Sequence, residues 1–552
     1  MDTIKKLVVE ACLGTLPDVF EVELSRPEEQ FGDFSTNVAL KLAGITKGNP
    51  RQIAEVIAVK LRENNVFSQV TIAGPGFINL SLADNQLLGL AAGTPATTLA
   101  GQSIIVEYSD PNPFKELHVG HLYDCVVGES IALLCEKAGG NVHRVNFGGD
   151  VGLHVGKSMW AVLQHLGGEK PEELAKVAES DRPKWLASVY VEGSNAYEED
   201  ESAKASITML NARVYDIHAQ NDHESPLARI YWETRQWSYD YFDAFYARIG
   251  TKFEKYYPES ATVSAGVAAV KEQLSNGIFE ESDGAVVFKG EVHSLHTRVF
   301  INSNGLPTYE TKDIGLALSK WQDYHSDRNI ILTGNDIVEY MKVILAALGS
   351  FEPEIAARTT HLTHGMVKLA GGTKMSSRKG NVIRANDVLS MTADAIAAAG
   401  QVASESTLQA AIKYAFLKQR LGGDIIFDPK DSVSLEGNSG PYLQYAHARA
   451  RSILQKSTSQ PIAPSVLETG ERSLVRKIGE FAEVVDRAVA ELLPHHICTY
   501  LYELAQIFNR FYENNRVLDD PRQDSRLWLV QTYADTLRDG LGLLNINAPD
   551  KM

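Results

Sequence analysis

Hydrophobic residues follow two different periods along the chain, and the period changes from region to region. Short β-branched runs over residues 104–108 and 142–147 are typical of buried strands in a parallel sheet, and an apolar-periodic helix ending near Lys137 lies between them. From about residue 400 onward the apolar residues recur at spacings of three and four, as they do in helical bundles. The pattern therefore predicts an α/β core followed by an all-α region.

The first 100 residues predict a separate small α/β unit. A helix runs from Ile4 to Cys12, a second helical pattern follows Asn37, and residues 74–82 read as a turn and a strand. Residues 89–102 are rich in Gly, Ala and Thr, which favours a linker to the next unit.

Residues of about 157 to 300 interrupt the alternation of strands and helices, which indicates an insertion between two halves of the sheet. The acidic stretch 192–201 is interpreted as a solvated face, and the aromatic helix 231–246 as core rather than a stacking platform for bases. After residue 299 the sheet resumes, with a helix from Tyr309 and a short strand over 329–332.

The all-α region predicts a bundle in which one helix spans residues 474–492. Its apolar face is formed by Leu474, Ile478, Phe481, Val485, Ala488 and Leu492. Further helices are expected over residues 440–454, 496–514 and 523–541.

Composition adds limits to this picture. The length of 552 residues predicts two to four domains, and 53 basic against 70 acidic residues give a formal charge of −17. An acidic chain can still carry a locally basic nucleic-acid surface. The four scattered cysteines form no CxxC pair, and neither a membrane-spanning run nor a signal peptide is evident, so we expect a protein of the reducing cytoplasm.

Two histidines stand where the first strand feeds its helix, in the sequence His118-Val119-Gly120-His121. The N–H groups and the dipole of a helix N-terminus favour anions, and Gly120 leaves room for a ligand near the backbone. A zinc pair and simple capping histidines are the alternatives. No HExxH or CxxC pattern supplies further zinc ligands, so we expect no metal site.

The stretches 106–122 (VEYSDPNPFKELHVGHL) and 145–152 (VNFGGDVG) resemble the class I arginyl-tRNA synthetases, in which HVGH corresponds to the HIGH signature. Residues 31–43 resemble the appended N-terminal domain of that family, which contacts the tRNA elbow, and residues 437–454 resemble its anticodon-binding bundle. The resemblance implies an N-terminal domain over 1–100, a Rossmann-like catalytic domain over 101–395 and a helical anticodon-binding domain over 396–552.

The loop Lys374-Met375-Ser376-Ser377-Arg378-Lys379-Gly380 resembles the second class I signature, KMSKS. Residues 374–384 hold four basic residues and no acid, which suits a triphosphate. The resemblance implies ATP, with Mg²⁺ as its counter-ion, and catalytic roles for His118, His121, Lys374 and Lys379. It also places ATP on His118, Gly120, His121, Lys374, Met375, Ser376 and Ser377.

The substrate side chain must be matched by carboxylates, because a guanidinium presents a planar fork of donors. Acids near the expected strand ends are Glu107, Asp110, Asp313 and Asp336, although Asp110 or Asp336 could be only a cap or a surface ion pair. The resemblance puts Glu107, Asn112, Tyr309 and Asp313 on arginine-contacting positions. We therefore expect L-arginine at Glu107, Asp110, Asn112, Tyr309, Asp313 and Asp336.

The expected macromolecular partner is tRNA(Arg). Aromatic and cationic residues occur together in the helix 440–454, as single-stranded RNA recognition requires. The predicted contacts are Tyr442, Gln444, Tyr445, His447, Arg449 and Arg451, although helix packing alone could explain Tyr445. We expect a monomer, and the resemblance implies that arginine activation needs bound tRNA.

Some positions depart from the family pattern. Tyr123 replaces the usual arginine after HVGH-Leu, His154 stands at a common glutamine position, and Ile337 and Val338 replace histidines found in one branch. These changes concern detailed ATP contacts. Two alternative functions stay open, a synthetase for another amino acid and a degenerate synthetase that only binds tRNA. The intact HVGH and KMSSRKG motifs argue against the second.

Overall fold

A computed structural model describes residues 2–13, 21–371, 383–402 and 404–552. The central element is a parallel sheet in the order β11-β10-β4-β5-β6. Its strands are β4 (Ser103–Glu107), β5 (Asn141–Gly148), β6 (Lys255–Pro258), β10 (Arg328–Gly334) and β11 (Thr359–His364). The chain adds β5 on one side of β4 and later β10 on the other, so β4 and β10 flank the switch point where ligands bind in such sheets.

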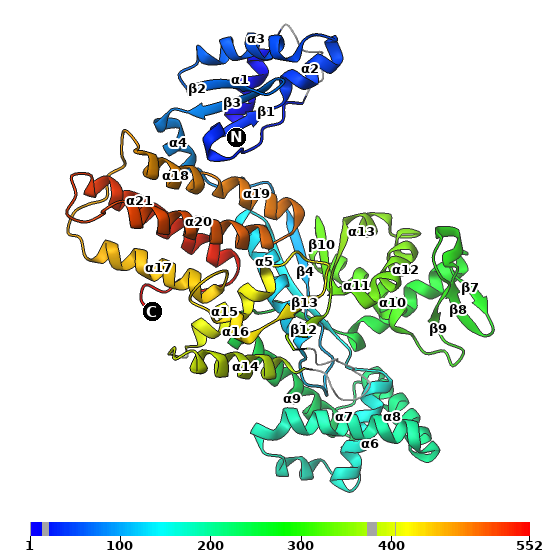
Figure 1. Cartoon of the computed structure of the whole chain (residues 1–552). Helices are drawn as coiled ribbons and strands as arrows, with labels where there is room; N and C mark the ends of the chain where they lie inside the picture. Colours follow the sequence, from blue (N-terminus) through cyan, green and yellow to red (C-terminus); the bar gives the residue numbers. More distant parts are fainter. Residues whose placement is uncertain (1, 14–20, 372–382, 403) are drawn as a thin grey trace.

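The expected insertion proves to be two separate excursions from the sheet, seen below and to the right of it in Figure 1. The first contains α6 (Leu153–Leu166), α7 (Arg182–Glu199), α8 (Glu201–Ala219) and α9 (Pro226–Ile249). Strand β6 then returns to pair with β5, which corrects the prediction of one continuous insertion over 157–300. The edge strand was missed because it has only four residues and no apolar run.

The second excursion follows α10 (Glu259–Ser275). It is a small antiparallel sheet of β7 (Glu280–Ser282), β8 (Ala285–Phe288) and β9 (Arg298–Ile301). The chain then enters α11 (Tyr309–Tyr324), and after β10 it continues through η5 (Asn335–Ile337), α12 (Val338–Gly349) and α13 (Pro353–Arg358). The aromatic helix α9 is core, as predicted, because Tyr231, Trp237, Phe242 and Tyr246 are all buried.

The helical region follows α14 (Ala385–Ala398) and α15 (Glu405–Leu417), and its last helices form the bundle on the left of Figure 1. These helices are α17 (Gly440–Gln455), α18 (Thr469–Ile478), α19 (Phe481–Glu491), α20 (His495–Asn514) and α21 (Gln523–Leu543). Before them lies α16 (Pro429–Ser432). Strand β13 (Ile425–Phe427) pairs with β12 (Val367–Leu369), so this pairing crosses the boundary expected near residue 395.

The single helix predicted over 474–492 is two helices, α18 and α19, separated near Gly479. Its predicted apolar face is confirmed, since Leu474, Ile478, Val485 and Ala488 are all buried. A Cβ on Gly479 would lie 3.2 Å from the Cβ of Leu90, so the break occurs where Leu90 packs closely against the bundle. Periodicity could not show this break because the apolar spacing continues across it.

The N-terminal unit lies at the top of Figure 1 against α18 and α19. It contains α1 (Asp2–Cys12), η1 (Glu29–Phe31), α2 (Val38–Thr46) and α3 (Pro50–Arg62), with an antiparallel sheet in the order β1-β3-β2. The strands are β1 (Phe34–Thr36), β2 (Phe67–Ala73) and β3 (Phe77–Leu82). Helix α4 (Asp84–Ala91) occupies the start of the expected linker, which is therefore shorter than predicted.

Candidate active site

The predicted ligand residues meet in a cavity of about 1170 Å³ at the carboxyl ends of β4, β5 and β10. The structure brings together there His118, Gly120, His121, Glu107, Asp110, Asn112, Tyr309, Asp313 and Asp336. Parallel strands end at one edge, so residues far apart in sequence become neighbours. Two chemically different ends result, one with the histidines and one with the carboxylates.

The two histidines cap α5 (Val119–Lys137) reciprocally. Nδ1 of His118 accepts from the backbone N–H of Gly120 at 3.1 Å and of His121 at 3.4 Å, while Nδ1 of His121 accepts from the N–H of His118 at 3.1 Å. Because both Nδ1 atoms accept, a neutral ring must carry its proton on Nε2. The rings stack with centroids 3.6 Å apart, and each keeps an Nε2–H donor for a ligand.

The histidine pair is electrically neutral at pH 7. Burial, followed by the charge of Lys115, lowers the pKa of His118 to about 4, and burial beside His118 lowers the pKa of His121 well below its usual value. Gly120 is required because a Cβ there would lie 2.8 Å from the His118 ring. Each histidine can therefore cap the helix through Nδ1 and still donate to a phosphate through Nε2, so the two interpretations are compatible.

The KMSSRKG residues, and with them Lys374, Met375, Ser376, Ser377 and Lys379, lie outside the described residues. The chain after them is described and contacts the HVGH segment. Val119 N–H donates to the Ile383 carbonyl at 2.9 Å, and Ala385 N–H donates to the Leu117 carbonyl at 2.8 Å. The Nε atom of Arg384 also lies 3.2 Å from an Oε atom of Glu116.

At the carboxylate end of the cavity, Glu107 is buried and Asp313 is half-buried, and each has a polar partner. Glu107 pairs with the Lys320 ammonium, which also donates to Asn329 Oδ1 at 3.2 Å. Asp313 accepts from the Tyr340 hydroxyl, and burial raises its pKa to about 7. These arrangements lower the cost of keeping two acids in the same cavity.

Two residues predicted to bind arginine, Asp110 and Asn112, accept hydrogen bonds from the backbone. Asp110 Oδ1 accepts from Phe147 N–H at 2.8 Å, and burial with the charge of Glu107 raises its pKa well above the usual range. Asn112 Oδ1 accepts from Gly149 N–H at 2.9 Å. Both side chains thus tie the end of β4 to the end of β5. Ser109 and Asp110 have φ of 78° and 45°, a strained conformation that turns the chain into the cavity.

Sequence reasoning missed several residues that line the cavity, namely Asp124, Glu259, Lys320, Tyr340 and His364. A signal for Lys320 existed, because Tyr309, Asp313, Leu316 and Lys320 recur at helical spacing and all face the cavity from α11. Glu259 pairs with Lys312 at 2.5 Å, and both are buried. The spacing of residues in the sequence could not reveal this pair, since Glu259 and Lys312 come from different helices.

The positions that depart from the family pattern have internal roles. Tyr123 is buried and packs edge-on against His364 at 4.7 Å between centroids. His154 Nε2 contacts the Gly149 carbonyl at 2.6 Å, which fixes the loop after β5. Ile337 lines the cavity beside Asp336, and Val338 begins α12.

The predicted tRNA contacts in α17 divide into two groups. Gln444 and His447 are buried and bind the carbonyls of Asn547 and Pro549 at 2.7 and 2.9 Å, which corrects their prediction as surface contacts. The reason is that the C-terminal segment covers this side of the helix. Arg451 pairs with Asp550 at 2.9 Å.

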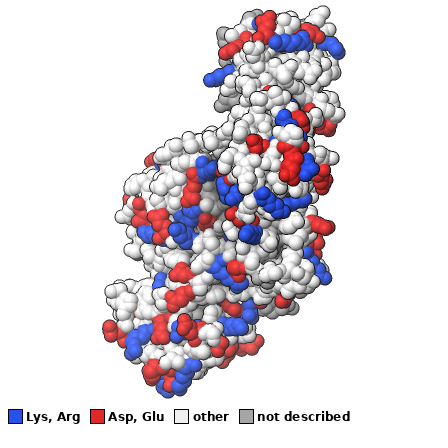
Figure 2. All heavy atoms as spheres, turned by 90° about the vertical axis from the view of Figure 1, so that its left-hand side faces the viewer, with Lys and Arg blue, Asp and Glu red and all other residues white. Residues whose placement is uncertain are grey.

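Tyr442, Tyr445 and Arg449 recur at i, i+3 and i+7 and share the other side of α17. Tyr445 is 45% exposed, and the Arg449 guanidinium lies 4.7 Å from the ring centroid of Tyr512 on α20. Asn509 donates to the Tyr442 hydroxyl at 2.9 Å. Figure 2 shows that Lys and Arg are interspersed with Asp and Glu on the side of the molecule that carries the bundle.

Within the described ranges, no group of three or more His, Cys, Asp or Glu side chains is placed to hold a metal ion. Among the same residues, none of the helices combines the length and apolar character needed to cross a membrane.

Comparison with known proteins covers nearly the whole chain. Residues 86–417 match the family described as "tRNA synthetases class I (R), catalytic domain", residues 443–552 the "DALR anticodon binding domain", and residues 2–82 the "Arginyl tRNA synthetase N terminal domain". An arginine–tRNA ligase of Porphyromonas gingivalis is 30% identical over 99% of this chain and 98% of its own length. One from Bacteroides fragilis is 29% identical with the same coverage.

Solved structures show the same fold. The arginyl-tRNA synthetase of Thermus thermophilus superposes with a TM-score of 0.80 at 24% identity, covering 100% of both chains. That of Plasmodium falciparum gives a TM-score of 0.81 at 23% identity, covering 100% of this chain and 99% of its own.

Proposed function

The chain belongs to the class I arginyl-tRNA synthetases, and from that membership we propose how its cavity ligates L-arginine to tRNA. The activity is ATP-dependent aminoacylation through an arginyl-adenylate. The family uses ATP and typically Mg²⁺. The observation that carries the proposed mechanism is the reciprocal capping of His118 and His121, which leaves two Nε2–H donors at the helix N-terminus.

In the first step, an oxygen of the arginine carboxylate attacks the α-phosphorus of ATP. The bond from that phosphorus to the bridging oxygen breaks, and pyrophosphate leaves. No general base is required, because the carboxylate is already ionised. Catalysis rests on position and charge stabilisation. We assign ATP binding to His118, Gly120, His121, Lys374, Met375, Ser376 and Ser377. We assign catalytic roles to His118, His121, Lys374 and Lys379.

In the second step, a terminal ribose hydroxyl of tRNA attacks the arginyl carbonyl and AMP leaves. Mg²⁺ accompanies the ATP phosphates as their counter-ion. We assign Asp313 and Glu107 to the guanidinium, Tyr309 to the wall of its pocket, and Asn112 to the backbone end of arginine. Asp110 and Asp336 complete the acidic lining. Pyrophosphate exchange measured with arginine, with and without tRNA(Arg), tests this assignment and the requirement for tRNA together.

Arginine binding should release a proton near neutral pH. Asp313 has a pKa of about 7 without ligand. A bound guanidinium favours the carboxylate, so the pKa falls on binding and the proton leaves. Below pH 7 the arginine affinity should drop by up to about tenfold per pH unit.

Calorimetric titration with arginine at pH 6, in two buffers with different ionisation enthalpies, measures this release. Asp313→Asn should abolish it. An affinity that is constant from pH 6 to pH 8 would contradict the assignment of Asp313.

We propose that the domains extend over residues 1–100, 101–395 and 396–552, with the first contacting the tRNA elbow and the last the anticodon. The anticodon face consists of Tyr442, Tyr445 and Arg449 on α17, because these residues share its exposed side. We also propose that the enzyme acts as a monomer in the cytoplasm.

Tyr445→Ala should weaken tRNA binding by about 5- to 150-fold, the range expected for one lost base–aromatic stack. Arginine-dependent chemistry at saturating tRNA should stay unchanged. Filter binding or fluorescence titration with tRNA(Arg) measures the effect. Lys342→Ala on α12 is the control, because Lys342 is exposed and pairs with Glu339 in its own helix. Equal affinities of the Tyr445→Ala and Lys342→Ala variants would rule out this face.

A further inference from the structure

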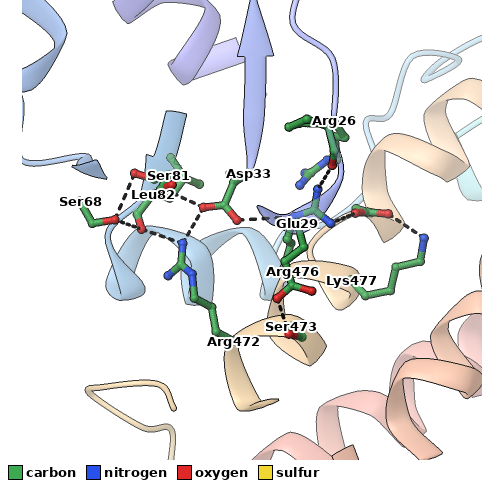
Figure 3. A network of polar contacts seen from close by, with 12 residues as sticks. Arg26, Glu29, Asp33, Ser68, Ser81, Leu82, Arg472, Ser473, Arg476 and Lys477 are labelled. Carbon is green, nitrogen blue, oxygen red and sulfur yellow. Dashed lines mark hydrogen bonds and ion pairs between the residues drawn. The ribbon is translucent and has the colours of Figure 1, made fainter. Parts of the chain in front are cut away.

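The N-terminal unit is joined to the helical domain through the buried carboxylate of Asp33 (Figure 3). Asp33 is 2% exposed, and its Oδ2 accepts from Leu82 N–H within its own unit at 2.7 Å. The same oxygen accepts from Arg472 Nη2 on α18 at 2.6 Å, and Oδ1 lies 3.6 Å from Arg476 Nε. One side chain therefore links the sheet of the N-terminal unit to two arginines of the bundle.

Each of the two arginines also donates to other groups of the N-terminal unit. Arg472 donates to Asp84 Oδ1 at 2.7 Å and to the Leu82 carbonyl at 2.9 Å. Arg476 donates to the Pro27 carbonyl at 2.7 Å. Charge-assisted bonds from fixed guanidinium planes define direction as well as distance, so α18 holds the unit in one orientation.

A second connection lies on α19. Arg26 and Glu483 form a two-bond fork, with Nε to Oε2 at 3.0 Å and Nη2 to Oε1 at 2.8 Å. Their side chains are only 14% and 23% exposed, and the Arg26 guanidinium also lies 4.3 Å from the Phe34 ring centroid. Two separate charged contacts prevent rotation about either one.

The local backbone of the N-terminal unit is shaped for this contact. Gly32 has a φ of 107°, and a Cβ there would lie 2.9 Å from the Leu80 carbonyl oxygen. That turn directs Asp33 toward α18. Asp33 belongs to the segment 31–43, which resembles part of a tRNA-contacting domain. Asp33, Arg472 and Arg476 are therefore directed at one another and not at solvent, where an RNA phosphate would meet them.

We propose that this set of contacts, which we call the domain latch, positions the N-terminal unit and the anticodon face of α17 to grip one tRNA simultaneously. The latch consists of Arg26, Asp33, Asp84, Arg472, Arg476 and Glu483. It rests on the proposed function, in which both domains contact tRNA. A fixed separation raises the effective concentration of the second contact once the first has formed, and it avoids the entropy lost when a free domain is ordered.

The latch residues are thus positioning residues for tRNA, and kinetics can separate that role from a general structural one. Asp33→Asn keeps the size of the side chain and removes its charge. This variant and Glu483→Ala should each raise KM for tRNA(Arg) about tenfold. The kcat at saturating tRNA and KM for arginine should remain within about twofold of wild type, because the cavity is untouched.

Two matched controls test the specificity of the effect. Arg487→Ala removes an exposed charge on α19 that pairs with Glu491 within the same helix, and it should leave KM for tRNA unchanged. Arg26→Glu should raise KM, and adding Glu483→Arg should restore it to within about threefold of wild type by re-forming the pair in reverse. If each single variant raises KM for tRNA and the double variant does not restore it, the Arg26–Glu483 ion pair does not set KM and the inference is wrong.

Equilibrium binding separates failure of the latch from failure of the proposed function. Wild type should bind whole tRNA(Arg) more tightly than an isolated anticodon stem-loop, and latch variants should lose that preference while keeping their stem-loop affinity. If wild type binds both RNAs equally, the N-terminal unit does not contact tRNA, and the latch inference fails with that part of the proposed function. If latch variants retain the wild-type preference and KM, the inference alone is overturned.

Discussion

Replacing His118 or His121 by alanine should slow arginyl-adenylate formation by about 10²- to 10³-fold, with affinities for arginine and tRNA changed by less than about threefold. Each variant removes one Nε2–H donor that we assign to the ATP phosphate oxygens, whose charge distribution changes in the transition state. Because the rings are neutral at pH 7, the lost term is a directed hydrogen bond and not a net charge. Single-turnover pyrophosphate exchange beside equilibrium binding measures the two quantities.

Loss of the helix cap must be separated from loss of the donor. Asn is a favourable N-cap residue, and its Oδ1 can replace His118 Nδ1 as the acceptor for Gly120 and His121 N–H. It has no donor at the Nε2 position. His118→Asn should therefore keep the unfolding free energy within about 0.5 kcal/mol of wild type, while the alanine variant loses about 1 kcal/mol. Adenylate formation at wild-type rate in His118→Asn would show that the histidine acts only as a cap.

The sequence was most informative where a pattern lies within one element. The period of the apolar residues identified β4, β5, β10 and the bundle faces, and HVGH lies at the start of α5 as predicted. The tautomers of His118 and His121 follow from hydrogen bonds that each Nδ1 accepts from backbone N–H groups two or three residues away. Because these contacts lie within one turn, the spacing of the two histidines in the sequence nearly determines them.

Contacts between elements that are distant in the sequence could not be predicted from such local patterns. Lys320 neutralises Glu107 from an element more than 200 residues away, and Gln444 is buried by a C-terminal segment whose path no local pattern reveals. Helix α17 shows the difference clearly. The composition of residues 442–451 indicated RNA binding for the whole run, but packing assigns Gln444 and His447 to the interior and leaves Tyr442, Tyr445 and Arg449 on one side. Strand β6 is too short to give a local signal, and its place depends on pairing with β5.

We expect discrimination between arginine and lysine to depend on the same kind of contact between distant elements. Asp313 on α11 and Glu107 on β4 converge on one cavity, and Lys320 already supplies an ammonium to Glu107. A guanidinium can bridge planar acceptors with parallel N–H bonds, whereas the lysine ammonium is a compact point charge that cannot satisfy both acids in fork geometry. Buried acceptors left unpaired usually cost a factor of 10⁴ or more in specificity, so wild type should charge lysine at least about 10⁴-fold less efficiently than arginine.

Asp313→Asn tests which acid carries this discrimination. The amide keeps the size of the side chain but loses the charge, so one face of the buried guanidinium is left without its counter-charge. Truncating one member of such a pair costs about 2 to 5 kcal/mol, and kcat/KM for arginine should fall by roughly 10² to 10³. Most of the loss should appear in KM for arginine, with adenylate formation at saturating arginine much less affected than in His118→Ala.

The matched control is Asp336→Asn, because Asp336 lines the same cavity from η5, the turn that follows β10. If Asp313 holds the guanidinium, Asp336→Asn should change KM for arginine by less than about fivefold, the loss of a single weak polar contact. Charging assays of Asp313→Asn and Asp336→Asn, each with arginine and with lysine, give the four kcat/KM values to compare. Efficient charging of lysine by wild type, or a larger arginine defect in Asp336→Asn than in Asp313→Asn, would move the guanidinium away from Asp313 and toward the β10 end of the cavity.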